Sequence, residues 1–349
     1  MGHVHDVQEQ VKNVLANIIL GIIVSFFLFP VSFAGIPVTV NSKMILAVIG
    51  IVLFLWDSLV ERTLSVSLPV IVSAAFAIVF SLWCYFCIVE NGTYDNSYAQ
   101  YWTSFATWTG AAYAVCSLLQ KVAGEITVKR LVYLMVWVCT VQCALALVID
   151  SNPAFQMFVD RHFPIGQEFM HKVDRLYGIG AALDPAGVRF SVVLILMCCQ
   201  MADDPEVQEN RPLTLFYLIG FAWITVVGSM ISRTTGVGAG LGLVYLLLSR
   251  TGWGRNSISR DSSFFWWSLI AIVSVTAVVS IIGYNTDLQF KAHLRFAFEG
   301  FFNWVETGEF RTGSTDKLNN EMWIWPNTPR GWVMGTGLYD NWIYGTDIG

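Results

Sequence analysis

The chain has 349 residues, of which 55% are hydrophobic and 13% are charged, and its formal net charge is -5. The charged share is about half of that in ordinary soluble domains, so the composition excludes a typical soluble fold. A nucleic-acid-binding protein is also excluded, because it needs a basic face and this chain is acidic. We therefore expect a membrane protein.

Apolar residues gather in blocks of the length, about 20 residues, at which a helix crosses a hydrocarbon core of about 30 Å. Lipid offers no partner for an unpaired backbone amide, so each span must be helical. The sequence predicts an all-α, polytopic protein that forms a single integral membrane domain over residues 1–349. Its nine predicted spans are 14–33, 43–57, 67–90, 101–120, 130–149, 187–202, 212–232, 235–249 and 263–284.

The first span is expected to be retained, because no small-x-small signal-peptide cleavage site follows its apolar stretch. Lysine and arginine are concentrated in the alternate short connections that begin with the N-terminal segment, which predicts a cytoplasmic N-terminus. Two long segments, 150–186 and 285–345, then lie on the outer side. Nine spans also leave the last residues outside, where we expect a further helix to follow.

The first long outer segment contains apolar residues at helical spacing, which predicts an amphipathic helix in the interface over about 165–177. Its basic residues Arg161 and Lys172 fit either headgroup anchoring or ligand binding. Arg175 then opens the sequence Arg-Leu-Tyr-Gly-Ile-Gly-Ala-Ala-Leu-Asp-Pro-Ala-Gly. Such broken backbone at membrane depth is tolerated chiefly where it lines a cavity. Arg189, just beyond, either snorkels to the interface or joins a binding site.

Ser232-Arg233-Thr234-Thr235 separates two spans on the outer side. A charge at such a position faces either headgroups or a polar cavity, and it is a functional candidate by default. The run that follows, Gly236-Val-Gly238-Ala-Gly240-Leu-Gly242, contains two overlapping Gly-xxx-Gly pairs. These pairs predict close helix packing, because the register of a phosphate-binding loop is missing.

The second long outer segment begins at residues 288–299 with alternating apolar and polar residues. Alternation favours a strand, but a helix would place Lys291, Arg295 and Glu299 on one stripe, and we prefer the helix. The further candidates in this segment are Arg311, Asp316, Glu321, Trp323, Trp325, Trp332, Tyr339 and Asp340. Aromatic rings and carboxylates suit a glycan, although the same tryptophans also fit an interfacial aromatic belt.

Arginines from separate outer segments indicate an anion at the membrane surface. A guanidinium group binds phosphate oxygens bidentately and stays charged, so a lipid diphosphate is the natural ligand. Its tail would lie between spans and its headgroup among the arginines. No clustered histidines or carboxylates occur at metal-ligand spacing, so no metal is expected.

At these residues the chain resembles the O-antigen and capsule repeat-unit polymerases and the wider superfamily that they share with O-antigen ligases. The resemblance rests on Arg175 with Gly178 and Asp184-Pro185 before a span, on Ser232-Arg233, and on Gly335-Thr-Gly337 followed by Asp347-Ile-Gly349. It implies a glycosyltransferase, independent of metals and cofactors, that polymerises undecaprenyl-diphosphate-linked oligosaccharide units with inversion. It also implies the bacterial inner membrane, a periplasmic active site, membrane lipid as a partner and a chain-length regulator protein as another.

Carried over to this sequence, the resemblance implies that Arg175 and Arg233 bind the donor diphosphate and stabilise charge on the leaving group. The acceptor hydroxyl needs a general base, and His293, Glu321 and Asp340 stay open as candidates. The expected substrate-binding residues are Arg189, Arg295, Arg311, Trp325 and Tyr339.

Four other activities were weighed. An O-antigen ligase that transfers glycan to a lipid A-core acceptor is disfavoured, because the only histidine of the second long segment, His293, lies near its start. A metal-dependent glycosyltransferase is discounted, because residues 34–42 contain no acidic residue. Two long outer segments argue against a flippase. A non-enzymatic transporter of lipid-linked oligosaccharides stays open.

Overall fold

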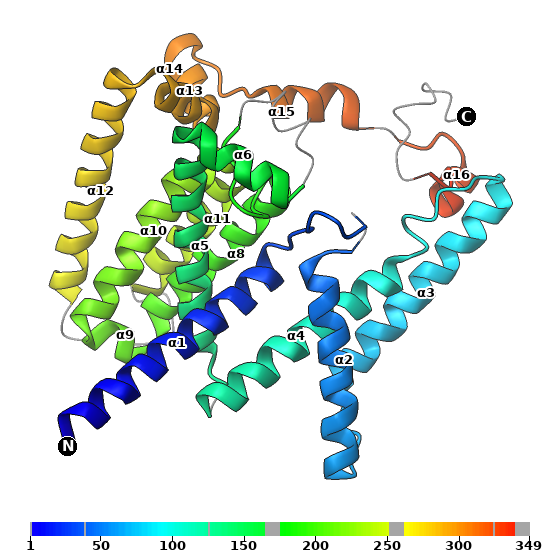
Figure 1. Ribbon diagram of the computed structural model, residues 1–349. Coiled ribbons are helices and arrows are strands. Elements are labelled where there is room, and N and C mark those ends of the chain that lie inside the picture. Colours follow the sequence, from blue (N-terminus) through cyan, green and yellow to red (C-terminus); the bar gives the residue numbers. More distant parts are fainter. Residues whose placement is uncertain are drawn as a thin grey trace. The chain divides into compact units, whose positions relative to one another are not determined.

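The computed structural model describes residues 2–37, 40–124, 126–164, 175–250, 262–323 and 325–338 (Figure 1). About 80% of the chain is helical, and the described residues contain no strand. The predicted all-α class is therefore confirmed. Residues 165–174 of the predicted amphipathic helix lie outside the described residues, and its last three residues, 175–177, are not helical, so the predicted end of this helix is wrong.

Six helices are long and apolar enough to cross a membrane, namely α2, α3, α5, α8, α10 and α12. They support a membrane-embedded protein. The predicted count of nine spans is not confirmed, because the apolar stretches Val14–Leu28 and Thr234–Ser249 are shorter, and α4 (Tyr101–Ala123) is not among the six. All nine predicted segments nevertheless lie on helices.

The helices form two compact units. The first contains α1 (Gly2–Leu28), α5 (Val128–Ser151), α6 (Pro153–His162), α8 (Leu183–Asp203), α9 (Pro205–Glu209), α10 (Arg211–Ile231), α11 (Thr234–Arg250), α12 (Ser262–Thr286), α13 (Leu288–Ala297) and α14 (Glu299–Thr307). The second contains α2 (Ser42–Glu61), α3 (Leu68–Asn91), α4, α15 (Gly313–Lys317), the π-helical turn Leu318–Met322 and α16 (Pro329–Met334).

The core of the first unit is the contact between α8 and α11. A Cβ atom on Gly238 would overlap the backbone of Ser191, and one on Gly242 would lie 2.9 Å from Cys198 Sγ. Gly236 and Gly240 make no such close approach. The predicted glycine packing is thus confirmed for one of the two pairs, and it fixes the start of α11, where Arg233 lies.

Two short helices continue from α12 in Figure 1. Asp287 begins α13 by accepting hydrogen bonds from the backbone amides of Gln289 and Phe290. The predicted helix over residues 288–299 is confirmed for α13, but it ends at Ala297 and α14 begins at Glu299. The expected single stripe of charges is therefore wrong, because the helix breaks between Arg295 and Glu299.

In the second unit, α2 and α4 cross where glycines allow close contact, since a Cβ on Gly50 would overlap the carbonyl of Gly110. Asp57 accepts a hydrogen bond of 2.9 Å from the hydroxyl of Tyr113 across the same two helices. The indole of Trp83 donates to the carbonyl of Val333, which ties α16 to α3. The described residues from Arg311 onward thus belong to the unit of α2, α3 and α4.

The α8–α11 contact generates a stability prediction. Gly238→Ala should lower the free energy of unfolding by about 1–3 kcal/mol, because the methyl group overpacks a backbone contact. Gly240→Ala is the matched control: it faces open space, and alanine favours a helix over glycine by about 0.5–1 kcal/mol. Thermal unfolding in detergent measures both. Equal melting temperatures for the two variants would contradict the packing argument.

Candidate functional site

The backbone that carries Arg175 is not helical from residue 175 to residue 180, as its glycines predict. Gln142 of α5 donates a hydrogen bond of 2.9 Å to the carbonyl of Ile179. Gly180 has a φ of +75°, and a Cβ there would lie 2.7 Å from the carbonyl oxygen of Phe29. Only glycine combines this conformation with this approach, so α1 and α5 hold the segment in place.

The segment is also tied to α6 through Tyr177. The hydroxyl of Tyr177 donates to Asp160 at 2.9 Å, and burial raises the pKa of Tyr177 to about 12. The phenol therefore stays neutral at physiological pH and keeps donating. Arg175 is two residues away, so this bond limits how far it can move.

Asp184 follows a strained residue at the start of α8. Leu183 has a φ of +53°, a conformation that costs a residue with a side chain roughly 1–2 kcal/mol. The strained turn places the Asp184 carboxylate where the hydroxyl of Ser232 donates to it at 3.1 Å. Strain of this kind tends to collect at functional sites.

The turn that carries Arg233 is pinned to the same end of α8. Ser191 donates a hydrogen bond of 2.7 Å to the carbonyl of Thr234. A Cβ on Gly187 would overlap the side chain of Ser232. Contacts on both sides of Arg233 thus fix where its side chain emerges.

Arg175 and Arg233 meet on one aromatic ring. The guanidinium carbon of Arg175 lies 4.4 Å from the ring centroid of Phe296, and that of Arg233 lies 4.5 Å from the same centroid. The two groups can be no further apart than the sum of these distances. Two residues 58 positions apart in sequence therefore share one environment, in which the ring stabilises both cations.

Two carboxylates balance this pair of cations. Glu299, the first residue of α14, forms an ion pair with Arg233. Burial lowers the pKa of Arg175, the charge of Arg233 lowers it further, and Asp184 and Glu299 act in the opposite direction. Both guanidinium groups remain charged at any physiological pH, so the site can bind an anion that displaces or joins its own carboxylates.

The other predicted arginines lie apart from this pair. Arg189 faces Phe29 of α1, with 6.0 Å from its guanidinium carbon to the ring centroid. Arg295 binds Glu306 through two hydrogen bonds of 2.7 and 2.8 Å, which raise its pKa and lower that of Glu306. Arg311 binds Asp316 at 3.1 Å in the second unit. None of these contacts includes Arg175 or Arg233.

Of the three candidate general bases, only His293 has a described side chain. His293 on α13 is 5% exposed, and its Nε2 lies 3.4 Å from Asp150 on α5 without a hydrogen bond. Its burial favours a structural contact over access to a substrate hydroxyl. Glu321 lies in the π-helical turn, where its side chain is not described, and Asp340 lies outside the described residues, as does Tyr339.

Trp325 belongs to a stack of three tryptophans in the second unit. Its ring centroid lies 5.7 Å from that of Trp323 and 5.5 Å from that of Trp332. All three side chains are more than half exposed. The stack offers a broad aromatic surface, which suits sugar rings or lipid headgroups equally.

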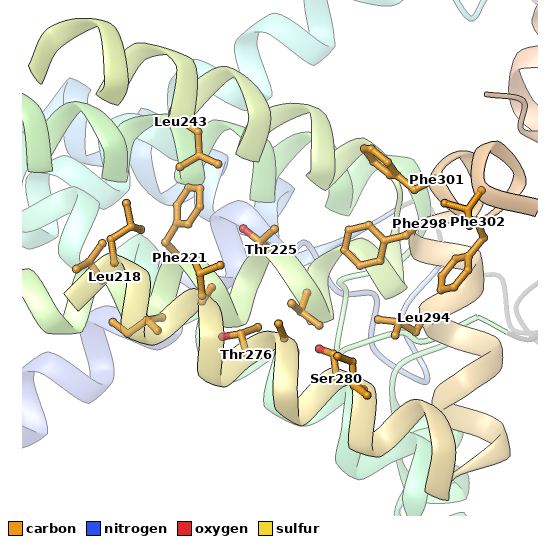
Figure 2. Close-up of a pocket in the computed structure, with 18 residues that line it drawn as sticks. Leu218, Phe221, Thr225, Leu243, Thr276, Ser280, Leu294, Phe298, Phe301 and Phe302 are labelled. Carbon is orange, nitrogen blue, oxygen red and sulfur yellow. The ribbon is translucent and has the colours of Figure 1, made fainter. Parts of the chain in front are cut away.

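An apolar pocket of about 610 Å³ lies between α10, α11, α12, α13 and α14 (Figure 2). Ligand pockets typically measure about 300–1,000 Å³. Phe298, Phe301 and Phe302 gather at one end, and Leu218 and Leu243 lie toward the other. The hydroxyls of Thr225, Thr276 and Ser280 are among its few polar groups. The pocket therefore suits a hydrocarbon chain.

The pocket and the arginine pair share the α13–α14 corner. Phe296 contacts both arginines and Glu299 pairs with Arg233, whereas Leu294 and Phe298 line the pocket. One short stretch of chain therefore presents a charged site on one side and an apolar site on another. An amphiphile with an anionic head meets both requirements.

Three members of this site were missed as site residues in the sequence. Asp184 was noticed only as part of a motif, Glu299 only as one charge of a stripe, and Phe296 only as one apolar residue of an alternating run. Asp184 lies three residues before a predicted span, which was an available signal, whereas Phe296 and Glu299 lie 12 and 15 residues beyond the end of the predicted span 263–284. What the sequence could not provide was the turn at Phe298, which brings Phe296 and Glu299 to the arginines.

Comparison with known proteins assigns no function to this site. No protein-family model, curated protein or solved structure matches the chain. The function is therefore inferred from the residues of the site.

The shared ring generates a binding prediction. Phe296→Leu should weaken the binding of inorganic pyrophosphate by about 2- to 30-fold, which corresponds to about 0.5–2 kcal/mol of cation–π stabilisation. Leucine keeps the apolar bulk but no longer orients the two guanidinium groups. The matched control is Phe216→Leu, in the separate aromatic cluster with Tyr133 and Trp137. Calorimetry in detergent measures the affinities, and an unchanged affinity for Phe296→Leu would count against the site.

Proposed function

We propose that this chain polymerises oligosaccharide repeat units carried on a polyprenyl diphosphate, at the outer face of the bacterial cytoplasmic membrane. The observation that carries the proposal is the pair of guanidinium groups, Arg175 and Arg233, on the ring of Phe296. Guanidinium groups match the paired oxygens of a diphosphate. The diphosphate has a charged oxygen for each arginine, so we propose that it bridges the pair.

The apolar pocket supports a lipid-linked substrate rather than a free nucleotide sugar. Its lining is almost wholly hydrocarbon, which favours an isoprenoid chain and offers few hydrogen-bond partners to a nucleobase or a second sugar. Because it shares the α13–α14 corner with the arginines, one substrate can place its head at Arg233 and part of its tail against Phe298. Both parts of the proposed donor thus have a site in the same unit.

In the proposed reaction, a hydroxyl oxygen of the acceptor unit forms a bond to the anomeric carbon of the donor. The bond from that carbon to the phosphate oxygen breaks, and its electron pair stays on the departing diphosphate. Arg175 and Arg233 neutralise the charge that develops there, which is the type of electrostatic stabilisation that commonly dominates enzymatic rate acceleration. The hydroxyl proton passes to a general base.

The direct test uses the purified protein in lipid nanodiscs with an undecaprenyl-diphosphate-linked oligosaccharide. The wild-type protein should produce a ladder of longer glycans. Arg233→Lys should lower the rate by about 100-fold or more, because lysine lacks the planar fork with which a guanidinium binds two oxygens in parallel. Arg130→Lys, a basic residue that pairs with Asn17 instead, is the matched control and should leave the rate unchanged.

The outcomes separate the alternative activities. A single transfer to a lipid A-core acceptor without a ladder would indicate a ligase. Movement of the substrate across a bilayer without a new glycosidic bond would indicate a transporter. Near-normal ladders from Arg233→Lys would reject the role given to this arginine.

The family resemblance also predicts that the reaction needs no metal ion. Addition of a chelator should leave the rate of ladder formation unchanged, because the diphosphate is already a good leaving group when the arginines neutralise it. The chelated and untreated reactions are compared at equal ionic strength. A loss of turnover that divalent ions restore would overturn the metal-independent mechanism.

A further inference from the structure

Glu299 lies at the point where the charged site and the apolar pocket meet. It is the first residue of α14 and forms an ion pair with Arg233. The preceding residue, Phe298, lines the pocket. About a third of the Glu299 side chain, 32%, is exposed, so a substrate group can reach it.

Of the three general-base candidates that the sequence predicts, only His293 has a described side chain. His293 is buried against Asp150. The side chains of Glu321 and Asp340 are not described. Among the described acidic residues, Glu299 and Asp184 are the two that influence Arg175. Asp184 already accepts a hydrogen bond from Ser232, whereas Glu299 faces Arg233, where the diphosphate is proposed to bind.

We propose that Glu299 is the general base of the transfer reaction and that it occupies Arg233 until the donor diphosphate displaces it. This inference rests on the proposed function. The ion pair with Arg233 engages the Glu299 carboxylate. A diphosphate that takes over the guanidinium ends this pairing and leaves the carboxylate available to accept a proton. Donor binding thus releases the base.

The proton and electron balance of this step is complete. The acceptor hydroxyl transfers its proton to a Glu299 oxygen as its own oxygen bonds to the anomeric carbon. The anomeric carbon–oxygen bond breaks, and the electron pair leaves on the diphosphate that Arg175 and Arg233 hold. When the diphosphate departs, the protonated Glu299 loses its proton to water and pairs with Arg233 again. No oxidant, metal or further reactant is required.

The experiment compares Glu299→Gln, Glu299→Asp and the wild-type protein in nanodiscs, with Glu306→Gln as the matched control. Glu306 lies on the same helix but pairs with Arg295, so its variant should keep the wild-type rate. Glu299→Gln should lose about 100-fold or more in the rate of ladder formation, the usual contribution of a general base. Its affinity for inorganic pyrophosphate should rise severalfold, because the competing carboxylate is gone.

Two further readouts distinguish a base from a structural residue. The residual rate of Glu299→Gln should rise with pH, since hydroxide then replaces the missing carboxylate, and Glu299→Asp should recover part of the activity. A Glu299→Gln variant with a ladder rate within threefold of wild type, or with weakened pyrophosphate binding, would overturn the inference. A wild-type protein that binds pyrophosphate but forms no ladder would instead reject the polymerase proposal, and with it the role of Glu299 in that reaction.

Discussion

The candidate site depends on one interaction, the contact of two guanidinium groups with the ring of Phe296. Like charges repel, and partial burial already lowers the pKa of Arg175. The protein holds the two cations together by fixing the backbone next to each of them. Gln142 and Gly180 hold the segment that follows Arg175. Contacts between α8 and the turn at Ser232 hold Arg233. Glu299 offsets the charge. Such an arrangement is preorganised for an anion, because little ordering remains to be done when the ligand arrives.

The same arrangement places a surface for the charged head of a substrate next to a surface for its apolar tail. The corner between α13 and α14 turns Phe296 and Glu299 toward the arginines and Phe298 toward the apolar pocket. A soluble diphosphate would use only the first of these surfaces, and a neutral lipid only the second. An amphiphile would use both, and this is the reason for which we propose a polyprenyl diphosphate as the ligand.

The sequence predicted much of the fold, because apolar length and glycine spacing act locally. Helices were found at all nine predicted segments, and Gly238 and Gly242 pack closely as expected. The count of spans was not confirmed, because the apolar stretches of α1 and α11 are shorter than those of the six candidate spans and α4 is not among the six. Arg175 and Arg233 were identified from their positions at broken backbone and span ends. Their partners Phe296 and Glu299 were not, because the helix break at Phe298 depends on tertiary contacts that residue spacing does not reveal.

The most direct test of the central claim is a double-mutant cycle with Arg175→Lys, Arg233→Lys and the combined variant, with pyrophosphate affinity as the readout. If one anion bridges the two guanidinium groups, the loss in the double variant should differ from the sum of the single losses by at least about 0.5 kcal/mol, the lower end for groups that share a partner. Losses that add within about 0.3 kcal/mol, or no loss in either single variant, would show that the arginines do not share a ligand.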